Sequence, residues 1–462
     1  MSAIINNSFR KYNADNFITS FASNNVYLTI GKNDPWAGPS TGEYVEQAPN
    51  DATVPIPLDT AVSYFKNHDD LIAIKKISSA DVSHVIKRVN WTTNTVYAEF
   101  DHLQDDMIDG VLLDSNGQPD SAGVLTDFFV MNSTFKVYKC ISNYGGSVST
   151  VEPTTTNLNI FETSDHYKWK FMFEVQQSDV VKFVTSDWIP LTAPADSISN
   201  PEQSAVENAA VDGALEHIAV TAGGAGYYSC IGTAQAGSTS NTIKLDVSAS
   251  SIDDYYIGMT VYITSGAGAG EFKTITDYVG GTRIATVSTV WTTIPTNTSV
   301  FQVMPAVNVA STTGSGAIYR VSAVTAGAIT KVTSVSRGTN YRDATATVTS
   351  GSGSSCILTP LVSPVNGHGK DAVTELGGAK VMLNTRLIGL DGSDFPINDD
   401  FRKVHLIVNP KVSAAGNALA TATTYATSEI LSDSGSIIYT EFRAPINRAP
   451  DSTEDIKLVI EF

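Results

Sequence analysis

Two loops of the sequence have the composition of a ligand-binding site. "GAGAG" (Gly266 to Gly270) has the glycine density of a phosphate-binding loop, but it lacks the GxxxxGK[ST] spacing. No helical pattern follows whose N-terminus could hold a phosphate. A tight hairpin turn explains this stretch better, because glycine readily adopts the positive φ angles that such turns require.

"DGSDFPINDD" (Asp391 to Asp400) gathers four aspartates, as a calcium loop does. It lacks the D-x-D-x-D-G order and the closing Glu of an EF-hand, so a solvated loop with turn-forming aspartates is the preferred interpretation. The sequence leaves open whether an ion binds there.

Histidine chemistry has equally little support. "GHGKD" (Gly367 to Asp371) could begin a Ser/His/Asp arrangement, yet no GxSxG motif supplies its nucleophile. The histidines are single and lack HxxxH or HxH spacing, so strand or loop positions are favoured over metal ligation. They are His68, His84, His102, His166, His217, His368 and His405. We therefore predict no catalytic, cofactor-binding or metal-binding residue, and a protein that is not an enzyme.

The amino-acid composition argues against several other classes of protein. The 462 residues carry 29 Lys+Arg against 47 Asp+Glu, a formal charge of −18 that would repel nucleic acid. The densest basic run holds only Lys75 and Lys76. No stretch reaches the length of a membrane span, and the N-terminus lacks the apolar core of a signal peptide. Three distant cysteines form neither a disulfide framework nor a CxxC site, which favours a reducing compartment.

The elements that would position any site are mostly strands. Alternation of apolar and polar residues at period two predicts strands in "TNTVYAEFD" (93–101), "TFKVYKCIS" (134–142), "YKWKFMFEV" (167–175) and "DIKLVIEF" (455–462). Helices are predicted in "PLDTAVSYFKNHDDL" (57–71) and "SDVVKFVTS" (178–186). The fold class is mainly β with minor α, a multidomain β-sandwich-like body with inserted small β modules.

Charged residues thin out in the middle of the chain, between Ala205 and Val365, where Gly, Ser, Thr, Ala and Val dominate. This region contains an imperfect repeat, "IAVTAGGAGYYS" (218–229) and "VTSVSRGTNYRD" (332–343). Between the copies, residues 251–291 indicate three strands separated by "SGAGAG" and "YVGGT" turns. We predict a body formed by 1–204 and 366–462, interrupted by β modules at 205–365, with the C-terminal strand completing a sheet begun by the N-terminal part.

Exposed aromatic side chains are the candidates for protein contacts. In "VYLTIGKNDPWAG" (26–38), Val26, Leu28 and Ile30 form one strand face and Gly31 to Pro35 turn the chain away. Trp36 then packs over the body's own core or against a neighbouring subunit, with the first favoured. The other candidates are Tyr227, Tyr228, Tyr255, Tyr256 and Tyr341, for which packing inside small cores is the favoured alternative.

Five groups of motifs, in this order, are similar to the baseplate wedge subunit family of T-even-type contractile-tailed phages. They are "VYLTIGKNDPWAG" (26–38), "FKVYKCISNYGGSVSTVEPT" (135–154), "DHYKWKFMFEV" (165–175) with "SDWIPL" (186–191), "FRKVHLIVNP" (401–410) and "GSIIYTEFRAPINRAPDSTEDIKLVIEF" (435–462). The resemblance covers residues 26–191 and 367–462, weakly between 50 and 127, and leaves the middle region as an extra part.

The resemblance implies a non-enzymatic virion protein without a cofactor. It implies a mostly β homodimer that packs among the other baseplate wedge proteins of the tail, assembled in the host bacterial cytoplasm. Two alternatives remain. A receptor- or glycan-binding tail protein would use the tyrosines of the middle region. A polysaccharide lyase or glycosidase would need paired carboxylates in a groove, which the low charge of that region makes scarce.

Overall fold

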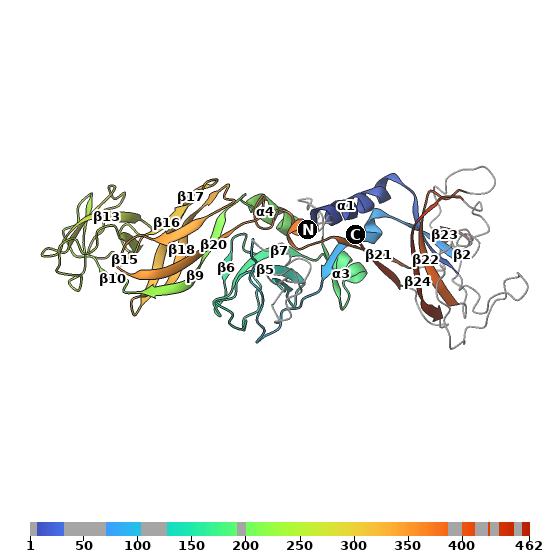
Figure 1. Cartoon of the computed structure of the whole chain (residues 1–462), viewed down its shortest axis with the longest axis horizontal. Coiled ribbons are helices and arrows are strands. Elements are labelled where there is room, and N and C mark those ends of the chain that lie inside the picture. Colours follow the sequence, from blue (N-terminus) through green and yellow to red (C-terminus); the bar gives the residue numbers. More distant parts are fainter. Residues whose placement is uncertain are drawn as a thin grey trace, which may run out of the picture. The chain divides into compact units, whose positions relative to one another are not determined.

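The computed structural model describes residues 7–31, 71–102, 127–191, 200–386, 400–411, 424–425, 434–447 and 455–462 (Figure 1). Strands dominate and the helices are short, which confirms the predicted mainly-β class. The chain folds into two compact units. Unit 1 comprises Met1–Arg88, Val175–Ala193 and Leu376–Phe462, and unit 2 comprises Val89–Glu174 and Pro194–Glu375. The division into 1–204, 205–365 and 366–462 stays a prediction.

Unit 1 contains a five-stranded antiparallel sheet with strand β1 near its centre. Val26, Leu28 and Ile30 of β1 join one hydrophobic cluster, as predicted, but Tyr27 and Thr29 are equally buried. β1 is therefore covered on both faces. The strand order is β23 (Thr424–Tyr425), β2 (Leu71–Ile77), β1 (Val26–Gly31), β22 (Asp400–Val408) and β24 (Ser436–Asn447).

The second sheet of unit 1 confirms that the C-terminal strand joins strands from the N-terminal part. Its order is β25 (Asp455–Glu461), β21 (Lys380–Arg386), β3 (Val82–Lys87) and β8 (Trp188–Leu191). β25 lies at the edge and pairs with β21, which pairs in turn with β3. Leu458 of β25 is fully buried in the same cluster as β1.

Two helices of unit 1 differ in how well the sequence predicts them. α3 (Gln177–Phe183) confirms the helix predicted at 178–186, whereas 57–70 lies outside the described residues. α1 (Asn7–Ser23) was not predicted, because its sequence has no acidic first turn and little amphipathic pattern. Its Ala14 and Phe21 are nevertheless buried in the core of unit 1, and Phe17 and Ile18 pack against the same core.

Unit 2 begins with a four-stranded antiparallel sheet in the order β4, β5, β7, β6. The strands are β4 (Phe129–Met131), β5 (Lys136–Ser142), β7 (Lys168–Glu174) and β6 (Phe161–Glu162). β5 and β7 confirm the strands predicted at 134–142 and 167–175. The strand predicted at 93–101 is wrong: Thr95 makes an isolated bridge to Ser149. The backbone amide of Ala98 donates to the carbonyl of Asp127, whereas the amide of Phe100 donates to the carbonyl of Cys140. The segment therefore pairs with different parts of the chain and forms no regular ladder.

The predicted repeat lies in two strands of one module, β9 (Leu215–Ala225) and β18 (Ala328–Thr339). Equivalent glycines, Gly224 and Gly338, have φ of 63° and 62°, and the tyrosines three residues later, Tyr227 and Tyr341, are buried in one core. β9 belongs to the sheet β16 (Val307–Ala310), β19 (Thr345–Val348), β20 (Ser354–Val362), β9, while β18 pairs with β17 (Ser315–Thr325).

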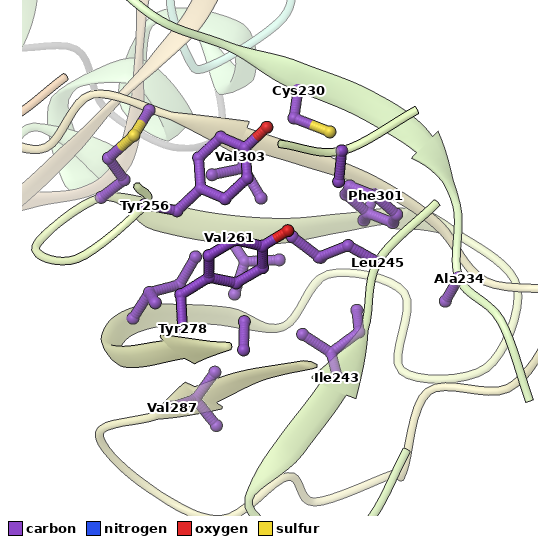
Figure 2. Packing of buried hydrophobic residues seen from close by; sticks show 14 of the residues in the cluster. Cys230, Ala234, Ile243, Leu245, Tyr256, Val261, Tyr278, Val287, Phe301 and Val303 are labelled. Carbon is purple, nitrogen blue, oxygen red and sulfur yellow. The ribbon is translucent and has the colours of Figure 1, made fainter. Parts of the chain in front are cut away.

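A six-stranded module is inserted between β9 and β16. The turns predicted at "SGAGAG" and "YVGGT" connect β12 (Thr260–Ser265), β13 (Phe272–Val279) and β14 (Ile284–Val287). The sheet is completed by β10 (Cys230–Thr233), β11 (Thr242–Lys244) and β15 (Val300–Met304). Figure 2 shows its core, where the Tyr256 and Tyr278 rings meet edge to face at 4.9 Å. Both ends of the module lie side by side, because Cys230 pairs with Val303.

Candidate functional site

One face of the β4–β7 sheet carries three lysines, Lys139, Lys168 and Lys170, which we call the lysine face. Lys139 of β5 lies opposite Lys170 of β7 in the strand pairing. Lys168 lies two residues before Lys170, and side chains at this spacing share a face of a strand. Lys139 and Lys170 are only 0% and 1% exposed, although an alternating strand would normally turn such residues to water.

The lysine face is covered by segments from both ends of the region 205–365. His217 of β9 comes from one end, and His368 and Glu375 follow the other. Glu375 ends the short helix α5 (Ala372–Glu375). Helix α4 (Pro201–Ala209) also contacts β7. The lysine face of this sheet is thus buried against other segments of the same chain.

Lys139 forms a buried ion pair with Glu375. Its Nζ lies 2.8 Å from Glu375 Oε2 and 3.1 Å from His368 Nδ1. The other carboxylate oxygen, Oε1, accepts a 2.7 Å hydrogen bond from the Gly369 amide. The Phe100 ring completes the enclosure, with its centroid 3.7 Å from Lys139 Nζ, and it meets the His368 ring edge to face at 5.1 Å.

The pKa shifts in this cluster favour a charged pair beside a neutral histidine. Burial alone would raise the pKa of Glu375, but the neighbouring Lys139 ammonium opposes this, and the pKa lies at about 2. Burial lowers the pKa of Lys139, and Glu375 opposes that shift. Burial and the neighbouring Lys139 lower the pKa of His368, so its neutral ring accepts a hydrogen bond from Lys139.

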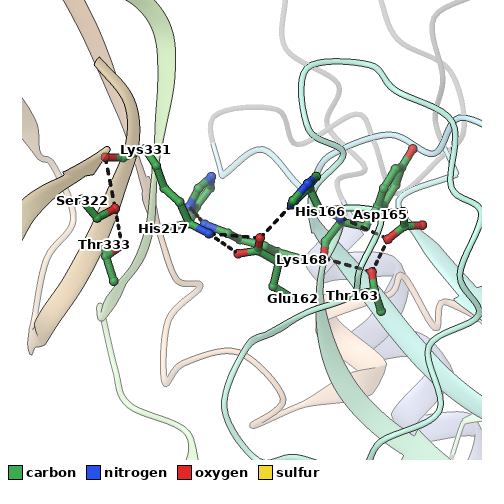
Figure 3. A network of polar contacts seen from close by, with 10 residues as sticks. Glu162, Thr163, Asp165, His166, Lys168, His217, Ser322, Lys331 and Thr333 are labelled. Atoms are coloured by element: carbon green, nitrogen blue, oxygen red, sulfur yellow. Dashed lines mark hydrogen bonds and ion pairs between the residues drawn. The ribbon is translucent and has the colours of Figure 1, made fainter. Parts of the chain in front are cut away.

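Beside the lysine face lies an open groove with a volume of about 680 Å³. β6 and β7 line one side, and the start of β9 with β17 and β18 lines the other. Figure 3 shows the polar contacts at this groove. Lys331 of β18 donates to both oxygens of Glu162 at 3.1 and 3.0 Å, and His166 lies 3.1 Å from the same carboxylate.

A second set of residues in the groove has a different charge pattern. Lys168 Nζ lies 3.0 Å from Nδ1 of His217. Burial, and then Lys168, lower the pKa of His217 to about 3, so its ring is neutral at pH 7. Arg337 Nη1 contacts Glu216 at 3.3 Å, and that carboxylate side chain is only 3% exposed. Such an arrangement of fixed charges suits electrostatic recognition.

The sequence-predicted residues lie elsewhere. Trp36 and residues 391–399 lie outside the described residues, and Asp400 is the first residue of β22. Tyr227, Tyr256 and Tyr341 are buried in the chain's own cores, which fits the alternative given for them. Tyr228 and Tyr255 are half-buried and stack at 4.5 Å. A role of any of the six in partner contacts stays a prediction.

Sequence reasoning missed the lysine face and the groove. The signal was present in "YKWKF", where Lys168 and Lys170 are two residues apart and fall on one side of the predicted strand. Periodicity cannot show that a distant segment covers that side. Within the described ranges, no group of three or more His, Cys, Asp or Glu side chains could hold a metal ion. No helix in this part of the chain has the length and apolar character to cross a membrane.

Comparison with known proteins gives one family match. Residues 369–462 match the family model described as Bacteriophage T4, Gp8. The matched segment contains Glu375 and strands β21, β22, β24 and β25. It supports the resemblance to the T4-type baseplate wedge at the C-terminal part of the chain, and with it a structural protein of the phage baseplate. No curated protein matches the chain.

Proposed function

We propose that this protein is a wedge subunit of a phage tail baseplate that holds other baseplate proteins through protein–protein interfaces, without catalysis. The family match at residues 369–462 carries this proposal. The buried pair between Lys139 and Glu375 adds support, because it joins the wedge-like motif "FKVYKC" to the matched segment. The first residues of the matched segment therefore pack against this motif within unit 2.

The proposal includes several finer points. The protein forms a homodimer, contacts other wedge proteins and resides in the tail of the virion after assembly in the bacterial cytoplasm. Residues 205–365 are an insertion between the two parts of the wedge body, 1–204 and 366–462. The formal charge of −18 keeps the unassembled subunit soluble.

Co-expression with the other tail proteins of its own phage tests the proposal. We expect the tagged full chain to co-purify with at least one of them, and native mass spectrometry to give a defined hetero-complex. The chain alone should have the mass of a dimer. A strictly monomeric chain that captures none of these proteins would contradict the wedge function.

A further inference from the structure

We propose that the groove beside the lysine face receives an acidic side chain, Asp or Glu, of a partner protein. This inference rests on the proposed function, because it identifies one contact through which the subunit would hold a baseplate neighbour. Its central residue on this chain is Lys168.

The groove has more positive than negative charge of its own. Its lining contains three cations, Lys168, Lys331 and Arg337, against two carboxylates, Glu162 and Glu216. Lys331 is matched by Glu162, and Arg337 by Glu216. Among the described residues, no carboxylate lies within 4.0 Å of Lys168, whose polar contact is the neutral His217. One positive charge is left for a ligand.

The lysine face behind the groove adds to this imbalance. Glu375 neutralises Lys139, but Lys170 is 1% exposed and contacts the carbonyl of Leu158. Ionised side chains removed from water are usually paired, because an unpaired buried charge is costly. Glu99 also acts on Lys168 through its charge, so five cations face four carboxylates across the lysine face and the groove. An incoming anion at Lys168 balances the remaining positive charge.

The groups at Lys168 suit a carboxylate. The ammonium donates to His217 Nδ1, which fixes the neutral imidazole with its proton on Nε2, a second donor. The Arg337 side chain is 34% exposed and lines the same groove. Charge-assisted hydrogen bonds from ammonium and guanidinium groups are the strong contacts for carboxylates.

The rest of the chain favours a single carboxylate on a protein over a polyanion. A formal charge of −18 repels nucleic acid or a highly charged polysaccharide, whereas one acidic side chain needs only the local excess of one charge. A groove of about 680 Å³ has room for a side chain together with the backbone that carries it.

Zero-length carbodiimide cross-linking of the co-purified baseplate complex tests this contact, since the reagent joins a lysine amine to an adjacent carboxylate. We expect a peptide cross-link between Lys168 and an Asp or Glu of a partner. Lys168→Arg should abolish the cross-link but keep the affinity. Lys168→Gln should abolish the cross-link and weaken the complex about tenfold at low salt, as expected for one close charge pair.

The control is Lys370→Gln, which removes an exposed lysine that does not line the groove. It should leave affinity and the Lys168 cross-link unchanged, and circular dichroism should confirm that all variants fold. If the complex forms and Lys168→Gln binds as tightly as the wild type, the groove proposal is overturned while the wedge function stands. If the wild type forms no complex, the result contradicts the proposed wedge function, and with it the groove proposal that rests on this function.

A final experiment tests whether the groove binds a small free anion in place of a protein side chain. If sodium glucuronate or inorganic phosphate raises the melting temperature of the wild type but not of Lys168→Gln, and the complex is unaffected by the substitution, the groove takes a small anion and the partner proposal is overturned.

Discussion

Lys139 and Glu375 show how a polar strand face becomes part of an interior. Removing each charge from water costs several kcal/mol, and a short, fully hydrogen-bonded pair offsets that cost only with good geometry. The 2.8 Å contact and the Gly369 amide provide this geometry. The pair gives little net stability over an apolar pair of the same size, but losing one partner is severe.

The pair predicts a pH dependence of stability. The folded pKa of Glu375, about 2, lies below the value of about 4.3 for unfolded Glu, so its contribution is complete above about pH 5 and is lost as pH falls toward 2. The shift corresponds to about 3 kcal/mol in the free energy of unfolding. Urea denaturation of the full chain between pH 7 and pH 3 should show roughly 2 kcal/mol of this loss, because the remainder is lost below pH 3.

Glu375→Gln should lower stability at pH 7 and flatten the acid dependence. Glu202→Gln, which removes an exposed carboxylate from α4, serves as the control. It should change neither the stability at pH 7 nor the acid dependence. An unchanged acid slope in Glu375→Gln would contradict the assignment of this pair.

A second prediction concerns the tyrosines of the repeat. A Cβ atom on Gly353 would lie 2.3 Å from Cγ of Tyr227, a ring that is buried and cannot easily move. Gly353→Ala should therefore cost about 1–3 kcal/mol through overpacking. Gly281→Ala is the matched control, because nothing lies within 4 Å of its added Cβ. Thermal melting of both variants measures the difference, and equal melting temperatures would refute the packing argument.

At the level of elements, the repeat was visible in the sequence and its cause is visible in the structure. Gly224 and Gly338 both need a left-handed backbone, and both lie against the tyrosine that follows them. In the partner strands, Ser354 pairs with Ala225 and Ser315 with Thr339, the last residues of β9 and β18. Two antiparallel strand pairs, β9 with β20 and β17 with β18, therefore contribute equivalent tyrosines to one core.

Strands β5, β7 and β25 could be predicted because each alternates strongly at period two. The helix α1 could not, since its burial depends on tertiary packing of a weakly amphipathic segment. The lysine face was beyond prediction for a different reason. Glu375 lies 236 residues from Lys139, and no local pattern records that these positions meet.

The position of β25 yields a third prediction. Deleting Lys457–Phe462 removes the fully buried Leu458 and leaves the ladder of β21 unpaired on one side. An open hydrophobic edge promotes aggregation. The truncated chain should appear in the insoluble fraction on expression, and a soluble, dimeric truncation by size-exclusion chromatography would contradict this.

At the level of the whole molecule, the six-stranded module is an insertion with its own core. Its buried residues form one cluster, separate from the cluster that contains Tyr227 and Tyr341. Because Cys230 and Val303 are paired neighbours, the chain leaves and returns at one place. The flanking strands β9 and β16 therefore do not need the module as a spacer.

This arrangement gives a fourth prediction. Replacing residues 231–302 by a short Gly/Ser turn should leave a soluble, folded chain that still co-purifies with the proteins found in the wild-type complex. Circular dichroism and co-purification measure the two parts of this outcome. Aggregation of the shortened chain would show that the module and its host depend on each other.

The adjacent ends of the six-stranded module also define a site where another domain can be inserted. Paired antiparallel residues lie about 5 Å apart, so a domain whose own termini are close together can be exchanged for the module without stretching the host. A fluorescent protein placed between Cys230 and Val303 would label each copy of the subunit at one known position. Single-particle fluorescence could then count those copies in an assembled tail.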